Sequence, residues 1–184
     1  MKKTLIRKIK MPVFMAGEGK SEEGYCRWLS RLAVGKSLPI HIRAEGLSGS
    51  DPLDLIEQAV SKLSRMEYGR RLFIHRSLLL DADLLGKKPE RDEKALQLAD
   101  KKRFSLIWQK PSHEGFILHH FREFQNHRPP DQASAEKLLN KAWGKYCKGM
   151  DADGYGSVLT LDNLAIARSI ERDLDKFLNK IGWQ

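Results

Sequence analysis

The stretch that decides the fold is residues 11–23, which read Met11-Pro12-Val13-Phe14-Met15-Ala16-Gly17-Glu18-Gly19-Lys20-Ser21-Glu22-Glu23. Residues 11–16 are mostly apolar and have the length of a short buried strand. A helix over 21–32 is expected next, because Ser21 is a good N-cap residue and carboxylates in a first turn interact favourably with the helix dipole. The stretch therefore predicts one strand followed by one helix.

The same alternation continues through the next hundred residues. Further strands are expected at 38–44, between Arg71 and Leu80, and at 104–108. Helices are expected from Asp51-Pro52 to Leu63, over 91–102 and over 116–124. Strands that alternate with helices indicate a parallel sheet. The sequence thus predicts a Rossmann-like α/β fold, with a central, mainly parallel four-stranded sheet flanked by helices.

The last third of the chain reads as helical. Residues 126–130 are polar and carry proline, a helix is expected over 133–146, and apolar residues at helical spacing predict one long amphipathic helix over 161–181. That helix should cover one face of the sheet. We therefore expect a single domain over 1–184, with an α/β core over 11–124 and a helical extension over 125–184 packed on the core.

Composition narrows the class of protein. Of 184 residues, 41% are hydrophobic and 31% are charged, and no apolar stretch approaches the roughly 20 residues that span a bilayer. The basic N-terminus lacks the continuous apolar centre of a signal peptide. Cys26 and Cys147 stand far apart and in no metal-ligand spacing, as expected of reduced thiols. We expect a cytoplasmic protein with no membrane association.

The net charge of +9 favours a polyanionic partner, and nucleic acid is the first candidate. Many of the basic residues, however, stand beside acids in helical segments. In the run 87–94, which contains Lys87 and Lys88, the alternative is an ordinary solvated face.

Carboxylates follow two of the predicted strands. Glu18 comes after the first strand, and Asp81 and Asp83 come after the third. Ligands of open α/β sheets bind outside the carboxyl ends of the strands, so these side chains are expected to converge. Mg²⁺ and Mn²⁺ prefer such oxygen ligands. A bare Asp-x-Asp is also common in turns, and the prediction depends on its pairing with Glu18.

These residues carry a resemblance to a known superfamily. Glu18-Gly19 and Asp81-x-Asp83 resemble the signature of the Toprim superfamily of topoisomerases, primases and nucleases, and residues 18–22 are similar to the E-G-x-[ST]-E form of its RloB-like branch. Residues 110–121 resemble the N-P-C-F-E-x-W-L-L-L-H-F element of that branch. They match it at Pro111, Glu114, His120 and Phe121, with Phe116 for Trp and His113 for the aromatic before Glu. Tyr146-Cys147-Lys148 resembles a late Tyr-x-Lys.

The resemblance implies a Toprim fold and a nuclease that hydrolyses DNA or RNA phosphodiester bonds with Mg²⁺ or Mn²⁺. Glu18, Asp81 and Asp83 would be both catalytic residues and metal ligands. It also implies a setting in defence against phage or mobile DNA, beside a partner ATPase. One alternative is a non-catalytic module of the same fold that binds nucleic acid or a protein. A nucleotidyl transferase is a third reading, without an evident priming or zinc module to support it.

Further residues have two readings each. Glu22 either interacts with the helix dipole or belongs to the site, and Lys20 is either exposed or bound to phosphate. Glu114 either caps a helix or orients a metal-bound water. His120 is expected to be a partly buried hydrogen-bonding residue. The lysines expected to contact nucleic acid are Lys20, Lys87, Lys88 and Lys148.

Two other patterns resemble metal sites without supporting one. Of His113, His119 and His120, the adjacent His119 and His120 would project to different sides of a helix, and hard cations do not favour imidazole. Counted from Asp151, an EF-hand loop would place Tyr155 and the short Asp162 at ligand positions, so this segment reads as a turn before the last helix.

Overall fold

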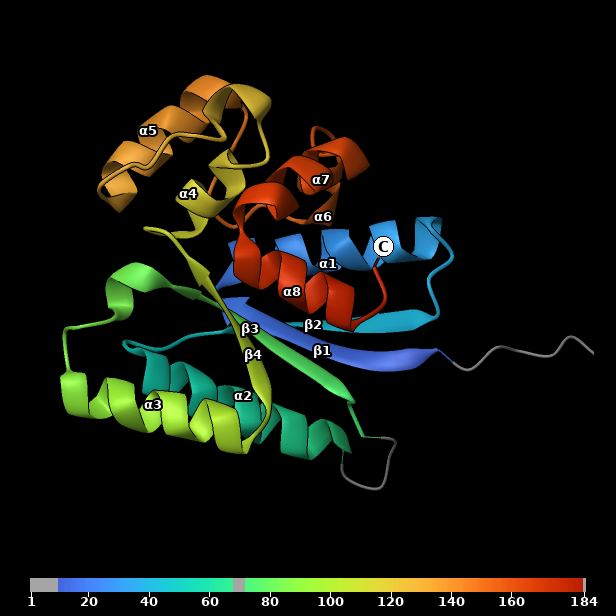
Figure 1. The fold of residues 1–184 in the computed structure, drawn as a ribbon, viewed down its shortest axis with the longest axis vertical. Coiled ribbons are helices and arrows are strands. Elements are labelled where there is room, and N and C mark those ends of the chain that lie inside the picture. The colour runs from blue at the N-terminus through green and yellow to red at the C-terminus, as the bar shows by residue number, and fades with distance from the viewer. Residues whose placement is uncertain (1–9, 68–71, 184) are drawn as a thin grey trace, which may run out of the picture.

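In the computed structural model, which describes residues 10–67 and 72–183, four parallel strands form one sheet in the order β2-β1-β3-β4 (Figure 1). The strands are β1 (Met11–Glu18), β2 (Ile40–Leu47), β3 (His75–Asp81) and β4 (Phe104–Gln109). Between them run α1 (Lys20–Gly35), α2 (Pro52–Glu67) and α3 (Pro89–Lys101). The predicted α/β fold is confirmed, and the sheet formed by the described residues is entirely parallel.

The register of the strands sets the position of the candidate site. β1 lies between β2 and β3, with Gly17 opposite Leu79 and Glu18 opposite Leu47. Asp81, at the end of β3, pairs with Gln109 at the end of β4. Glu18 and Asp81 therefore close two adjacent strands at the same carboxyl edge.

The two faces of the sheet carry separate apolar layers, because successive side chains of a strand point to opposite faces. α2 and α3 cover one face, where Phe14, Leu78 and Leu80 are buried (Figure 1). α1 and the C-terminal helices cover the other, where Val13 and Leu79 are buried. The sheet is thus the middle layer of three.

Five helices of the described chain follow β4. They are α4 (His113–Leu118), α5 (Gln132–Ala142), α6 (Ala152–Gly156), α7 (Leu161–Ile170) and α8 (Arg172–Lys180). Leu139, Leu164 and Leu174 join the same apolar cluster as the strand residue Val13, so the extension packs on the core. The helix expected over 116–124 is wrong in its bounds. α4 starts earlier, at His113, and a separate 3₁₀ turn occupies Arg122–Phe124.

The long helix expected over 161–181 is also wrong. The chain leaves the helical conformation at Glu171, whose φ is −87° and ψ is 85°, and continues as α8. The side chain of Glu171 is hydrogen-bonded to His119 Nδ1, and α8 contacts β4. The apolar periodicity predicted both halves of this segment but not the tertiary contacts that separate them. In the described residues, no helix combines the length and the apolarity needed to cross a membrane.

Candidate metal and phosphate site

A cavity of about 270 Å³ opens at the carboxyl edge of β1 and β3. It brings together the N-terminal turn of α1, the start of α4 and the segment after α5. The residues that line it are Glu18, Gly19, Lys20, Ser21, Glu22, Asp81, His113, Glu114, Gln132, Lys148 and Gly149. We call it the acidic cavity, since Glu18, Glu22, Asp81 and Glu114 all line it.

Glu18 and Asp81 each hold a buried oxygen that lacks a hydrogen-bond partner among the described residues, namely Glu18 Oε2 and Asp81 Oδ1. Burial first, and then the charges of Glu18, Asp83 and Glu114, together raise the pKa of Asp81 to about 8. The pKa of Glu18 is also raised, first by burial and then by Asp83, while Lys87 opposes the shift. The carboxylates are thus held close together with little compensating positive charge.

Asp83 takes a different position from the one that the sequence suggested. The strand ends at Asp81, and Ala82–Leu84 forms a 3₁₀ turn in which Asp83 is exposed and donates its backbone N–H to the carbonyl of Pro111 (3.2 Å). Asp83 does not line the cavity. Across the described ranges, no group of three His, Cys, Asp or Glu side chains is arranged to hold a metal ion. The structure brings Glu18 and Asp81 together at the cavity, while Asp83 is not among the lining residues.

Glu22 points into the cavity, with only 4% of its surface exposed. It fits beside β1 because Gly17 has no side chain, and a Cβ there would stand 2.3 Å from the Cβ of Glu22. Burial raises the pKa of Glu22 well above its usual range, and the charge of Asp81 adds to the shift. Glu22 is therefore a residue of the cavity as well as an acidic residue of the first turn of α1.

The start of α1 differs from the prediction. The N-cap is Gly19, whose φ of 91° suits glycine, and Ser21 lies inside the first turn. The hydroxyl of Ser21 instead accepts the backbone N–H of Gly149 at 2.8 Å. Ser21 therefore ties the segment after α5 to the cavity.

Glu114 is buried (3% exposed) at the start of α4. Its Oε2 accepts a hydrogen bond from the hydroxyl of Ser112 (2.8 Å), and its Oε1 accepts one from Tyr146 (3.5 Å). These donors fix the orientation of the carboxylate. The structure thus shows Glu114 as a cavity residue.

His113 is a cavity residue that sequence reasoning did not select. Gln109 Nε2 donates to its Nδ1 (2.6 Å), and its Nε2 donates to the hydroxyl of Tyr155 (2.8 Å). Burial lowers the pKa of His113 to about 3, so it is neutral at pH 7 and supplies no charge to Glu22, 3.8 Å away. Its departure from the aromatic expected before Glu114 was the only signal in the sequence.

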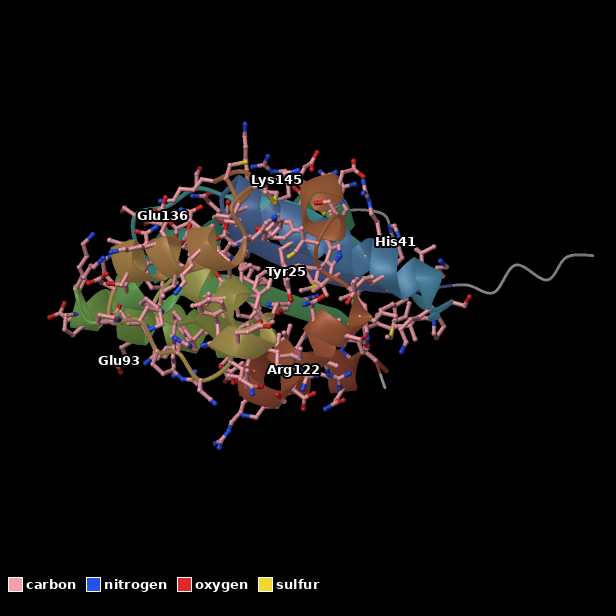
Figure 2. All side chains as sticks on the ribbon, turned by 90° about the horizontal axis from the view of Figure 1, so that it is seen from above. Tyr25, His41, Glu93, Arg122, Glu136 and Lys145 are labelled. Carbon is pink, nitrogen blue, oxygen red and sulfur yellow. The ribbon has the colours of Figure 1, made fainter. Side chains whose placement is uncertain are left out.

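His120 lies in the apolar core and is fully buried, more deeply than expected. Its Nδ1 donates to the carbonyl of Phe116 (3.3 Å), so its Nε2 accepts from the hydroxyl of Tyr25 (3.0 Å). Figure 2 shows Tyr25 near the centre of the molecule, whereas His41 and Glu93 lie toward its opposite ends. His120 does not line the acidic cavity, and its contacts are those of a core residue.

The predicted nucleic-acid-binding lysines divide into two groups. Lys20 and Lys148 line the acidic cavity, although Lys148 Nζ is 3.0 Å from Glu136 Oε2. Lys87 is exposed, and its positive charge acts to lower the pKa of Glu18. Lys88 instead lies 3.1 Å from the buried carboxylate of Asp51. Lys20 and Lys87 are therefore the better placed to meet an anion at the cavity.

The segment from Asp151 forms a helix cap. Asp151 accepts the backbone N–H of Gly154 at 2.9 Å as the N-cap of α6, and Asp153 forms an ion pair with Arg31. These carboxylates have structural partners, and where a turn was expected the chain forms the short helix α6, which comes before α7.

Fold and cavity together define a class: a parallel α/β protein with an acidic cavity at the carboxyl edge of its sheet. Comparison with protein-family models, with curated proteins and with solved structures finds no match for this chain.

Proposed function

We propose that this protein is a metal-dependent nuclease that hydrolyses phosphodiester bonds of DNA or RNA with Mg²⁺ or Mn²⁺. The observation that carries the proposal is the acidic cavity itself. Glu18 and Asp81 are the last residues of adjacent strands there. Each has one buried carboxylate oxygen without a hydrogen-bond partner in the described part of the chain.

The residues present fit a hard divalent cation. Carboxylates that repel one another gain from a cation between them, and Mg²⁺ commonly takes one or two carboxylates together with phosphate oxygens. Glu18 and Asp81 would hold the ion, and Asp83, which does not line the cavity, is the third residue of the proposed catalytic set. When bound, such an ion polarises a phosphoryl oxygen and lowers the pKa of a bound water.

The remaining cavity residues suit the binding of a phosphodiester. Lys20 lies in the first turn of α1, where the helix dipole and the lysine both favour an anion. Lys148 lines the cavity from the opposite segment. Glu114, held by Ser112 and Tyr146, is oriented to accept a proton from a water in the cavity. Burial and the charge of Asp81 raise the pKa of Glu22 well above its usual range, which favours the protonated form that can donate a hydrogen bond.

The biological setting is part of the same proposal and rests on the RloB-like resemblance. It comprises defence against phage or mobile DNA in the cytoplasm, and a partner ATPase. Cys26 is buried and Cys147 exposed, and both are free thiols, which suits a reducing compartment.

A non-catalytic binding module is the second candidate function. The exposed position of Asp83 favours it, because Asp83 does not line the acidic cavity together with Glu18 and Asp81. On this reading Lys20 and Lys148 would bind a polyanion without cleavage. Nucleotidyl transfer is the third possibility, which incorporation of nucleotides on a template would support.

The test is cleavage by the full-length chain. Labelled single- and double-stranded DNA and RNA are incubated with Mn²⁺, Mg²⁺ or EDTA. Cleavage that needs the metal is expected, and Glu18→Gln or Asp81→Asn should reduce it by at least about 100-fold. Asp162→Asn, at an exposed carboxylate on α7, is the matched control. Full activity in both cavity variants would overturn the proposal.

A binding measurement separates the two candidates. Titration with Mn²⁺ alone, followed by thermal unfolding, should raise Tm in the wild type and not in Asp81→Asn. Metal binding without cleavage of any substrate would favour the binding module.

A further inference from the structure

A second cavity, of about 370 Å³, shares no lining residue with the acidic cavity. It is bounded by the end of β4, the connection from α4 to α5, and the junction of α7 with α8. Its lining residues are Trp108, Lys110, His119, Arg128, Ile170, Glu171, Arg172, Asp173 and Lys176. We call it the basic cavity.

The charge of the basic cavity is opposite to that of the acidic cavity. Among its lining residues, four cationic side chains (Lys110, Arg128, Arg172 and Lys176) face two carboxylates. The carboxylate of Glu171 is hydrogen-bonded to the imidazole of His119, and Asp173 is 3.8 Å from Lys176. Lys110 and Arg172 are exposed. The excess of cations makes this cavity complementary to a polyanion.

Arg128 is held in place before any ligand arrives. Its Nη1 donates to the carbonyls of Gln125 (2.9 Å) and His127 (2.8 Å), and lies 3.1 Å from His119 Nε2. His119 is itself 2% exposed and fixed by Glu171. A guanidinium ordered in advance loses less conformational freedom when it binds an anion.

One short segment separates the two cavities. Lys110 lines the basic cavity, while His113 and Glu114 line the acidic one. The carbonyl of Pro111, between them, accepts the backbone N–H of Asp83. Four residues of extended chain span at most about 14 Å, so the Cα atoms of Lys110 and Glu114 are no further apart than that. A nucleic-acid strand in the acidic cavity would have neighbouring phosphates within reach of Lys110.

From these observations we infer that the basic cavity binds the sugar–phosphate backbone of the nucleic acid next to the segment held in the acidic cavity. The strand would then pass from the acidic cavity to the basic cavity. That the ligand is a nucleic acid rests on the proposed function. Phosphate contacts of this kind position a strand without reading its sequence.

The experiment measures binding without cleavage. A fluorescein-labelled single-stranded oligonucleotide is titrated with the full chain in EDTA, at several salt concentrations. Lys110→Ala combined with Arg172→Ala is expected to raise Kd about tenfold and to flatten the slope of log K against log[salt] by about 1.4. Lys94→Ala with Lys101→Ala is the control, because it removes the same charge from exposed positions of α3, on the opposite face.

An unchanged Kd in the Lys110/Arg172 variant would overturn the inference, as would an equal loss in the α3 control, which would reflect net charge alone. Absence of oligonucleotide binding by the wild type would do the same. Circular dichroism and Tm confirm that each variant is folded. Binding that depends on Lys110 and Arg172 without any cleavage in Mn²⁺ would leave the inference standing and remove the nuclease proposal.

Discussion

Gly17 of β1 lies directly against Glu22 of α1, where a Cβ on the glycine would approach the Cβ of the glutamate to 2.3 Å. The hydrogen atom at position 17 is what allows a carboxylate to be buried beside the sheet. The relationship links the packing of the first βα unit to the charge of the acidic cavity.

Gly17→Ala is therefore expected to destabilise the protein by about 1–3 kcal/mol, because the added methyl group must displace Glu22 or the backbone. Urea unfolding measures this change. Gly35→Ala is the control, since a Cβ at Gly35, the last residue of α1, meets no described atom within 4 Å. Equal stability of the two variants would show that Glu22 moves aside at no cost.

Asp81 should make the stability of the metal-free protein depend on pH. Its pKa is about 8 in the folded state against 3.8 ordinarily, so between these values the folded chain retains a proton that the unfolded chain loses. The free energy of unfolding consequently falls as pH rises from about 4 to 8. In EDTA, the free energy of unfolding of Asp81→Asn minus that of the wild type should increase by about 1–3 kcal/mol as the pH is raised from 4.5 to 8.

Urea unfolding at the two pH values tests this expectation, with Asp162→Asn as the exposed control. Parallel pH curves for the wild type and Asp81→Asn would contradict it. Mn²⁺ should also stabilise the wild type more at pH 8 than at pH 5, because the carboxylate is ionised more fully there.

How much of this could be predicted from sequence differs between the fold and the site. The alternation of apolar runs with helical periodicity was sufficient for the parallel sheet, and it placed Glu18 and Asp81 at strand ends. The position of Asp83 depended on where β3 stops. Residues two apart share a direction only while a strand persists, and here a 3₁₀ turn begins at Ala82.

Contacts between distant residues were the part that no local pattern could show. Glu22 can be buried only because Gly17 of β1 lies opposite it and has no side chain. The hydrogen bond of His113 depends on Tyr155, which is 42 residues later in the sequence. Lys88 resembled a free cation in the sequence, yet its partner Asp51 is 37 residues away.

His113 should affect stability at acidic pH in the opposite sense to Asp81. Its pKa is about 3 when folded and 6.5 ordinarily, so between these values only the unfolded chain gains the proton. Stability is lost as pH falls from about 6.5. In His113→Gln, the slope of the unfolding free energy between pH 4 and 6 should decrease by up to about 1.4 kcal/mol per pH unit.

Chemical unfolding across that pH range measures the slope. His41→Gln, at an exposed histidine of β2, is the control. If the slope of His113→Gln equals that of the wild type, His113 is charged in the folded protein.

Asp51 combines a helix cap with two ion pairs, and substitutions can separate them. Its carboxylate accepts hydrogen bonds from Lys88, from Arg91 and from the backbone N–H of Asp54 at the start of α2. Asp51→Ala should cost about 1–2 kcal/mol, and Asp51→Asn less, because the amide oxygen still caps the helix.

Thermal and urea unfolding rank the three proteins. Arg91 holds the pKa of Asp51 well below its usual range, so the advantage of the wild type should diminish as pH falls below about 3.8. An order in which Asn is no better than Ala would assign the whole effect to charge.

The break between α7 and α8 at Glu171 determines where the charged side chains of α8 lie. A continuous helix through this point would not give α8 an independent direction, and Arg172 and Lys176 could not both flank the last strand. The direction of α8 is held by the His119–Glu171 contact, by Arg168 of α7, which donates to Asp175 and Asn179 of α8, and by the packing of α8 on β4. Substitutions at His119 or Glu171 would therefore remove one of the contacts that orient α8 and its charges, while β1 and β3 keep their register.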